Sequence, residues 1–205
     1  MLPGLALIVK CPHCKAEKSL LTLESGNTFG GKQWWDLKTF YPMLPHVSWV
    51  QKCPACGGYF FYERARHRNG DDYSSERGEL EYPDMREALA ALRSGAGKKD
   101  RINLFLEYIW AYNDEFQRGS VQEDHKPSEE ELEEFRGVVR ELIGIFSVES
   151  KLIYAEFLRE AALFDEALEV VRQEGIPEDG IYRNLAETIL SKCQNKDTSV
   201  GLVSK

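Results

Sequence analysis

Two Cys-x-x-Cys pairs constrain the fold of this chain more than any other feature of its sequence. The pairs are Cys11-Pro12-His13-Cys14 and Cys53-Pro54-Ala55-Cys56. Each pair can present two thiolates to one ion, and two pairs complete a tetrahedral ligand set. Four thiolates leave no coordination position open for water. The sequence therefore predicts a structural metal site, with Cys11, Cys14, Cys53 and Cys56 as its ligands, rather than a catalytic one.

Zinc is the ion that this ligand set predicts, and iron is the alternative. Zinc suits closed tetrathiolate sites, and it stabilises small units that have little hydrophobic core. Iron is the alternative because the segment Cys53-Pro54-Ala55-Cys56-Gly57 resembles the metal-binding knuckle of rubredoxins, which bind iron. Lys15, not glycine, follows the first pair, so this resemblance covers only the second knuckle.

Other uses of the cysteines and nearby histidines are disfavoured but open. A thioredoxin-like redox pair would begin a helix after a buried strand, and neither pair does so. His13 and His46 could replace a cysteine as ligands, although four cysteines already complete the set. Cys193 falls on the apolar side of a C-terminal helix, which favours a buried space-filling thiol over a fifth ligand or a nucleophile.

Composition and length indicate a soluble, folded protein. The chain has 205 residues, of which 42% are hydrophobic and 29% charged, so it can bury a substantial core.

The apolar start, residues 1–9, lacks a basic beginning and runs directly into Lys10 and Cys11, which favours a buried strand over a signal peptide. No apolar run approaches the ~20 residues that cross a bilayer. We expect a cytoplasmic protein with no membrane partner, in a compartment where thiols stay reduced.

Charge is distributed unevenly along the chain. The formal net charge of −8 disfavours a nucleic-acid binder when the whole molecule is considered. Residues 1–68, however, carry nine Lys and Arg against four Asp and Glu, whereas the remainder carries 17 against 30. Arg64, Arg66 and Arg68 would share one face of a continuing strand and could contact phosphate or nucleic acid. A solvated edge, or a face toward the acidic helical part, is the preferred interpretation.

The segment around the cysteines is predicted to be a zinc ribbon spanning residues 1–68. Strand-like runs precede and follow each knuckle, at residues 5–10, 19–24, 47–51 and 57–62. The 38 residues between the two pairs exceed the usual ribbon spacer, which indicates an elaborated hairpin or a long loop. Residues 10–62 resemble uncharacterised bacterial zinc-ribbon proteins, and that resemblance implies a fold but no particular activity.

The remainder is predicted to be all-helical, which makes the fold class α+β. A linker at residues 69–82 leads into a helical domain at 83–194, and a flexible tail is expected at 195–205. Helices are expected from Pro83, over Ile102–Phe116, from Ser128 and over the final stretch 181–193. Ser128 and Glu131 form a capping box, so the acidic residues that follow are interpreted as a solvated first turn.

One stretch of the helical domain, residues 152–171, resembles a tetratricopeptide repeat. The resemblance rests on the small Ala155, a short turn near Phe164-Asp165, and Ala167 and Val171 as inward positions of the second helix. It implies stacked helix pairs that present a protein-binding surface. Because an array needs ~3 repeats, the preceding helices must act as neighbours, or the match is only a helical hairpin.

Enzymatic activity is not expected from these motifs. The sequence has no Gly-rich phosphate loop, no His-Glu-x-x-His and no Gly-x-Ser-x-Gly. Its histidines are scattered through predicted loops, at positions 13, 46, 67 and 125. We therefore predict a binding or scaffold protein with a structural zinc ion and an unidentified protein partner. The alternatives are nucleic-acid binding by Arg64, Arg66 and Arg68, and rubredoxin-like electron transfer by iron.

Overall fold

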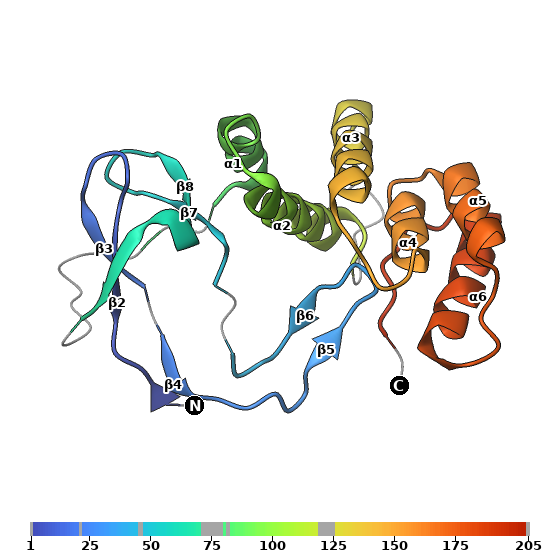
Figure 1. The fold of residues 1–205 in the computed structure, drawn as a ribbon, viewed down its shortest axis with the longest axis horizontal. Coiled ribbons are helices and arrows are strands. Elements are labelled where there is room, and N and C mark those ends of the chain that lie inside the picture. Colours follow the sequence, from blue (N-terminus) through green and yellow to red (C-terminus); the bar gives the residue numbers. More distant parts are fainter. Residues whose placement is uncertain are drawn as a thin grey trace. The chain divides into compact units, whose positions relative to one another are not determined.

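The computed structural model describes residues 2–20, 22–44, 47–70, 80, 83–118 and 126–203. The chain forms two compact units. The first contains residues 1–31 and 40–107, and the second contains residues 32–39 and 108–205. Short antiparallel strands come first and six α-helices follow within the described residues, which confirms the predicted α+β class (Figure 1).

Two hairpins carry the knuckles in the first unit. Strand β2 (Leu7–Lys10) pairs with β3 (Glu17–Leu20) on one side and with β9 (Arg66–Asn69) on the other, both antiparallel. Strand β7 (Val50–Lys52) pairs with β8 (Tyr59–Phe61). Strands therefore flank both knuckles, as the sequence predicts, but each is shorter than its apolar run.

The predicted return strand at residues 19–24 is two strands. Its first part belongs to β3, and its second part belongs to β4 (Leu23–Ser25), which pairs with the N-terminal β1 (Leu2–Pro3). Within the long spacer, β5 (Lys32–Gln33) pairs with β6 (Thr39–Phe40). The turn between β5 and β6 has a positive φ of 67° at Leu37.

Helix α1 (Met85–Leu92) begins two residues later than the sequence predicts. The Asp84 side chain accepts hydrogen bonds from the backbone N–H groups of Arg86 and Glu87, at 2.9 and 3.1 Å. A carboxylate at the N-cap satisfies amides that have no partner in the first turn, so the helix starts after Asp84 and not at Pro83. In the first unit Ala88 and Leu89 are buried.

The next two helices follow the predicted periodicity. Helix α2 (Lys98–Phe116) buries the stripe Phe105, Ile109, Tyr112 and Phe116. Helix α3 (Glu129–Ile145) starts at the predicted capping box, in which the Ser128 hydroxyl accepts from Glu131 N and the Glu131 carboxylate accepts from Ser128 N. In the second unit, the Tyr112 and Phe135 rings stack with centroids 3.8 Å apart.

The stretch that resembles a tetratricopeptide repeat forms two helices. They are α4 (Leu152–Glu160) and α5 (Phe164–Glu174), joined by a tight turn in which Ala162 has a φ of 56°. Ala155, Ala167 and Val171 are buried, as expected for inward positions. A helical hairpin is therefore present.

The last helix, α6 (Gly180–Gln194), also follows the predicted pattern in part. Leu185, Ile189 and Cys193 are buried, which confirms Cys193 as a buried thiol, whereas Ile181 in the first turn is 43% exposed. None of the helices in the described ranges has the length and apolar character to cross a membrane.

The segment after α6, predicted as a flexible tail, has backbone hydrogen bonds to other parts of the second unit. The backbone N–H groups of Trp35, Val200 and Val203 donate to the carbonyls of Gly201, Gln117 and Gln33, at distances of 2.9 to 3.1 Å. These bonds give the extended segment partners that a solvated tail would lack. Most of the predicted linker at 69–82 lies outside the described residues.

Candidate metal centre

The two knuckles have the same backbone hydrogen-bond pattern. In the first, Cys11 N donates to Ala16 O at 2.9 Å, and Lys15 N donates to Cys11 O at 3.1 Å. In the second, Cys53 N donates to Gly58 O at 3.0 Å, and Gly57 N donates to Cys53 O at 2.7 Å. Each pattern closes a tight turn between two strands. Both cysteines of each pair are thereby fixed at the end of a hairpin.

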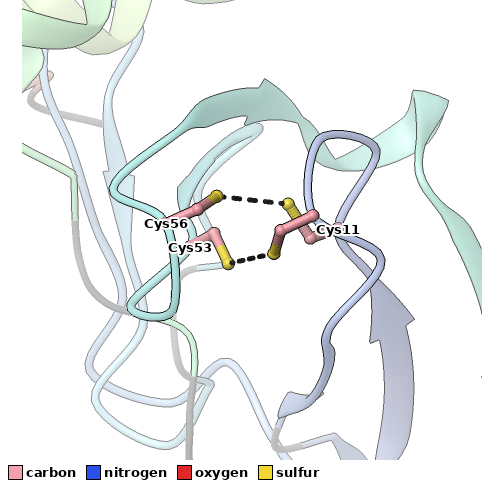
Figure 2. Close-up of side chains that lie close together, drawn as sticks. Cys11, Cys53 and Cys56 are labelled. Atoms are coloured by element: carbon pink, nitrogen blue, oxygen red, sulfur yellow. Dashed lines mark hydrogen bonds between the residues drawn. The ribbon is translucent and has the colours of Figure 1, made fainter.

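The two turns bring all four predicted cysteine sulfurs together, and in Figure 2 the labelled cysteines face one another. The Sγ atoms lie within 4.8 Å of one another. Cys11 Sγ is 3.8 Å from Cys56 Sγ, and Cys14 Sγ is 3.7 Å from Cys53 Sγ. A tetrahedral ion with metal–sulfur bonds of about 2.3 Å requires sulfurs about 3.8 Å apart. The cysteines are thus positioned to hold a metal ion.

The sulfur spacing excludes disulfide bonds in this arrangement. A disulfide joins two sulfurs at about 2.05 Å, far below the distances between the paired cysteines. All four cysteines are free thiols, and each close approach joins one hairpin to the other, not the two cysteines of one turn. An ion bound here would link two segments that are about forty residues apart in the sequence.

The four thiols differ in burial and acidity. Cys11 and Cys53 are buried, whereas Cys14 and Cys56 are exposed. A backbone hydrogen bond from Ala16 is the largest influence on Cys14 and lowers its pKa to about 7. Burial raises the pKa of Cys53 to about 12. Metal binding at Cys53 must therefore release a proton near neutral pH, because only the thiolate coordinates.

The core behind the sulfurs is small. Val9, Phe60 and Ala65 pack with the two buried cysteines, and three partly buried side chains complete the cluster: Leu20, Tyr62 and Leu80. The first unit also buries Ile8, Val50 and Phe61, so this cluster is one part of its apolar core. An ion that bridges the hairpins would add a cross-link to this packing.

His13 does not join the four sulfurs as a ligand. Its Nε2 donates to Tyr59 O at 2.9 Å, so the side chain connects the first knuckle to strand β8. Gly58 permits this approach, since a Cβ at that position would lie 2.7 Å from His13 Cδ2. The other ligand candidate, His46, lies outside the described residues, as does His125.

The three arginines that follow the second knuckle do not form one row. The chain turns through a short 3₁₀ helix, η1 (Tyr62–Arg64), before β9 begins, so Arg64 is not part of the strand. The expectation of a shared strand face is therefore correct for Arg66 and Arg68 and wrong for Arg64. Arg68 forms an ion pair with Glu17 at 3.0 Å, and Arg64 forms one with Asp100.

The second unit contains a buried polar network that the sequence analysis missed. Asp36, in the segment between β5 and β6, is fully buried and accepts hydrogen bonds from Asn113 Nδ2 at 3.0 Å and from Arg118. Asn113 also donates to Glu160 at 3.0 Å. Burial raises the pKa of Asp36 and raises that of Glu160 well above its ordinary value.

A second charged pair lies on helix α4. Arg159 and Glu156 are fully buried, and two guanidinium nitrogens contact the two carboxylate oxygens at 2.8 and 2.7 Å. Arg159 also donates to the carbonyls of Asp197 and Ser199, which holds the C-terminal segment. In the sequence, this buried pair could have been recognised from Glu156, Arg159 and Glu160, which are three or four residues apart among apolar residues of one short helix.

Comparison with known proteins gives no relative for this chain. No protein-family model, no curated protein and no solved structure matches it. The site is therefore interpreted from its own geometry.

Proposed function

We propose that this protein is a binding or scaffold protein whose N-terminal hairpins are held together by one structural zinc ion. The observation that carries the proposal is the convergence of four cysteine sulfurs, all within 4.8 Å of one another. Four protein ligands satisfy a tetrahedral ion and leave no position for water or substrate. In this function the ion stabilises the fold, and binding is the task of other surfaces.

Zinc is proposed over iron because four thiolates form a closed structural site and because Lys15, not glycine, follows the first Cys-x-x-Cys pair. The alternative is rubredoxin-like electron transfer by iron, and the matched backbone of the two knuckles suits both metals. Elemental analysis of the purified full-length protein separates them. Zinc should be found at one ion per chain in a colourless sample, whereas a red, iron-containing sample would support electron transfer.

Substitution of single cysteines tests the ligand set. Cys14→Ser should abolish stoichiometric zinc binding, because it removes one of four ligands. Cys193→Ser is the matched control, since this buried thiol belongs to helix α6 and not to the cluster. The ligand assignment fails if Cys14→Ser retains one tightly bound ion, or if mass spectrometry of the native protein finds the four thiols oxidised in pairs.

The helical part is proposed to bind a protein partner. The hairpin of α4 and α5 is followed by α6, and the loop before α6 exposes Ile176, with Ile181 exposed in the first turn of α6. Their exposed fractions are 51% and 43%. Exposed aliphatic side chains close in sequence suit contact with an apolar protein surface.

The partner proposal is tested with variants of the full-length protein. Affinity capture with quantitative mass spectrometry should identify a protein that wild type retains and Ile181→Asp loses. Phe29→Asp is the control, because Phe29 is 81% exposed in the first unit and outside the helical part. If every captured protein binds the Ile181→Asp variant equally, the helical part is not the binding surface. Substrate turnover in an activity screen would contradict the non-enzymatic assignment.

Nucleic-acid binding through Arg64, Arg66 and Arg68 is the second candidate function. Ion pairs within the first unit reduce the number of these arginines that are available to a phosphate group. Two of these arginines are engaged by carboxylates of the same unit. Within the described residues Arg66 forms no ion pair and lies opposite Lys10, so it is the arginine of this set that is best placed to meet a phosphate group.

A further inference from the structure

An open pocket of about 460 Å³ lies beside the first knuckle. It is lined by Lys10, Cys11, Pro12 and Lys15 of the knuckle, and by Arg64 and Arg66. All six residues belong to the first unit. Four of the six side chains are cationic, which makes the pocket strongly positive although the whole chain carries a net charge of −8.

The cations of the pocket are brought together by strand pairing. Lys10 of β2 lies directly opposite Arg66 of β9, so their side chains leave the sheet on the same face. Like charges placed directly opposite one another on neighbouring strands are destabilising. Glu17 lies opposite Lys10 from the other side, but its carboxylate contacts Arg68. The repulsion between Lys10 and Arg66 is thus built into the register of the sheet.

Two of the four cations are held in place by neighbours. Lys15 Nζ donates to Pro12 O at 2.6 Å, which folds the side chain back over the knuckle. Arg64 contacts the Asp100 carboxylate, and a Cβ at Gly97 would lie 3.2 Å from its Nη2. Asp100 is the single carboxylate that contacts these four cations within the described part of the chain.

Phosphate is the ligand chemistry that this arrangement fits. Arginine offers two parallel N–H donors to phosphate oxygens, and lysine adds a mobile point charge. Because Asp100 neutralises only one of the four cations, the pocket suits a doubly charged ligand such as phosphate better than a ligand with one carboxylate. A pocket of about 460 Å³ also has room for more than one phosphate. A group of this charge would relieve the repulsion between Lys10 and Arg66.

We propose that Lys10, Lys15, Arg64 and Arg66 form a binding site for phosphate groups at the side of the metal-binding knuckle. The phosphate belongs either to a free nucleotide or to the backbone of a single-stranded nucleic acid, since both present the same oxygens. The site requires the fold of the first knuckle and does not require any particular metal there. Elemental analysis tests the metal, so the two proposals can fail separately.

The experiment measures binding to the metal-loaded full-length protein. Pyrophosphate and a nucleoside monophosphate are titrated by calorimetry, and a fluorescein-labelled 12-nucleotide single-stranded DNA by anisotropy at several salt concentrations. For the DNA, contact by four cations predicts a slope of log K against log salt of about −3, since each neutralised phosphate contributes about −0.7. Binding by the small ligands with no DNA binding supports a nucleotide source, and tight DNA binding with this slope supports a nucleic acid.

Matched variants separate the pocket from general charge effects. Lys10→Gln and Arg66→Gln should each weaken binding about tenfold, the effect of losing one charge-assisted hydrogen bond. Lys32→Gln makes the same change in net charge at an exposed position of the second unit and should leave binding unchanged. Thermal unfolding is recorded for each variant to establish that it is folded. The proposal is overturned if no phosphate ligand binds, or if Lys32→Gln weakens binding as much as the pocket variants.

Discussion

Lys15 and Gly57 occupy the same position in the two knuckles, and both have left-handed backbones, with φ angles of 65° and 69°. Each residue donates its N–H to the carbonyl of the first cysteine of its pair. Glycine reaches this conformation without strain, whereas a residue with a Cβ does not. The first knuckle therefore carries a strain that the second avoids, and the Lys15 side chain partly offsets it by donating to Pro12 O.

Gly57→Ala should destabilise the metal-loaded protein by about 1 kcal/mol, because alanine disfavours a positive φ. A Cβ at Gly57 would meet no atom within 4 Å, so the effect isolates backbone strain from steric overlap. Chemical denaturation monitored by circular dichroism measures the change. Gly95→Ala is the control, since it is equally open but has no positive φ. Equal losses for the two variants would show that the knuckle conformation is not the cause.

His13→Ala should leave one metal ion per chain and lower stability by about 1 kcal/mol, the usual net contribution of one hydrogen bond. The reason is that His13 Nε2 donates to Tyr59 O and takes no part in the four-sulfur cluster. Elemental analysis gives the ion content, and denaturation gives the stability. Loss of the ion in His13→Ala, with retention in Cys14→Ser, would reverse the assigned roles of these two residues.

Asp36→Ala should destabilise the second unit by about 3–5 kcal/mol, because it leaves the Arg118 guanidinium buried without its main partner. The Arg118 side chain is only 9% exposed and also stacks on the Trp34 ring. Asp114→Ala provides a matched control, since Asp114 contacts the same arginine from a position that is 45% exposed. Its loss should cost less than about 1 kcal/mol. Similar unfolding midpoints for the two variants would contradict this difference.

Glu160→Gln should remove part of the pH dependence of stability. Burial raises the pKa of Glu160 well above its ordinary value of 4.5, so the native state holds a proton that the unfolded state releases. Stability conferred by Glu160 is therefore complete at pH 4 and falls as pH rises above 4.5, by up to about 1.4 kcal/mol per pH unit. Glutamine keeps the acceptor for Asn113 and cannot ionise, so the variant should match wild type at pH 4 and exceed it at pH 8.

The measurement is a series of denaturation curves from pH 4 to pH 8. Glu166→Gln is the control, because Glu166 is about half exposed and pairs with Arg140. An unchanged pH slope in Glu160→Gln would show that the carboxyl is ionised in the native protein. The charged groups that act on Glu160 stay the same in the variant: Glu156, Asp36 and Arg159.

Local patterns in the sequence predict much of this structure. The Cys-x-x-Cys spacing predicts that four sulfurs meet, because each pair has to lie on one tight turn. The capping box at Ser128 predicts the start of α3, and the apolar stripe at residues 105–116 predicts the buried face of α2. Both are present in the structure. In each case the information lies within a few residues of the element that it specifies.

Long-range relationships could not be predicted in the same way. Asp36 and Asn113 are 77 residues apart, and neither residue type indicates burial when considered alone. The C-terminal segment has the composition of a flexible tail, yet Arg159 fixes it through two of its backbone carbonyls. The left-handed backbone at Lys15 could not be predicted either, because it follows from the geometry of the hairpin turn, whereas lysine itself disfavours a positive φ.

The discontinuity of the second unit has a consequence for synthesis of the chain. Residues 32–39 emerge from the ribosome early, but the backbone partners of Gln33 and Trp35 are Val203 and Gly201. At translation rates of about 5–20 residues per second, this segment waits roughly 10–30 s for the residues that cover it. Trp34 and Trp35 therefore lack their partners Leu202 and Gly201 until the C-terminal segment has been made.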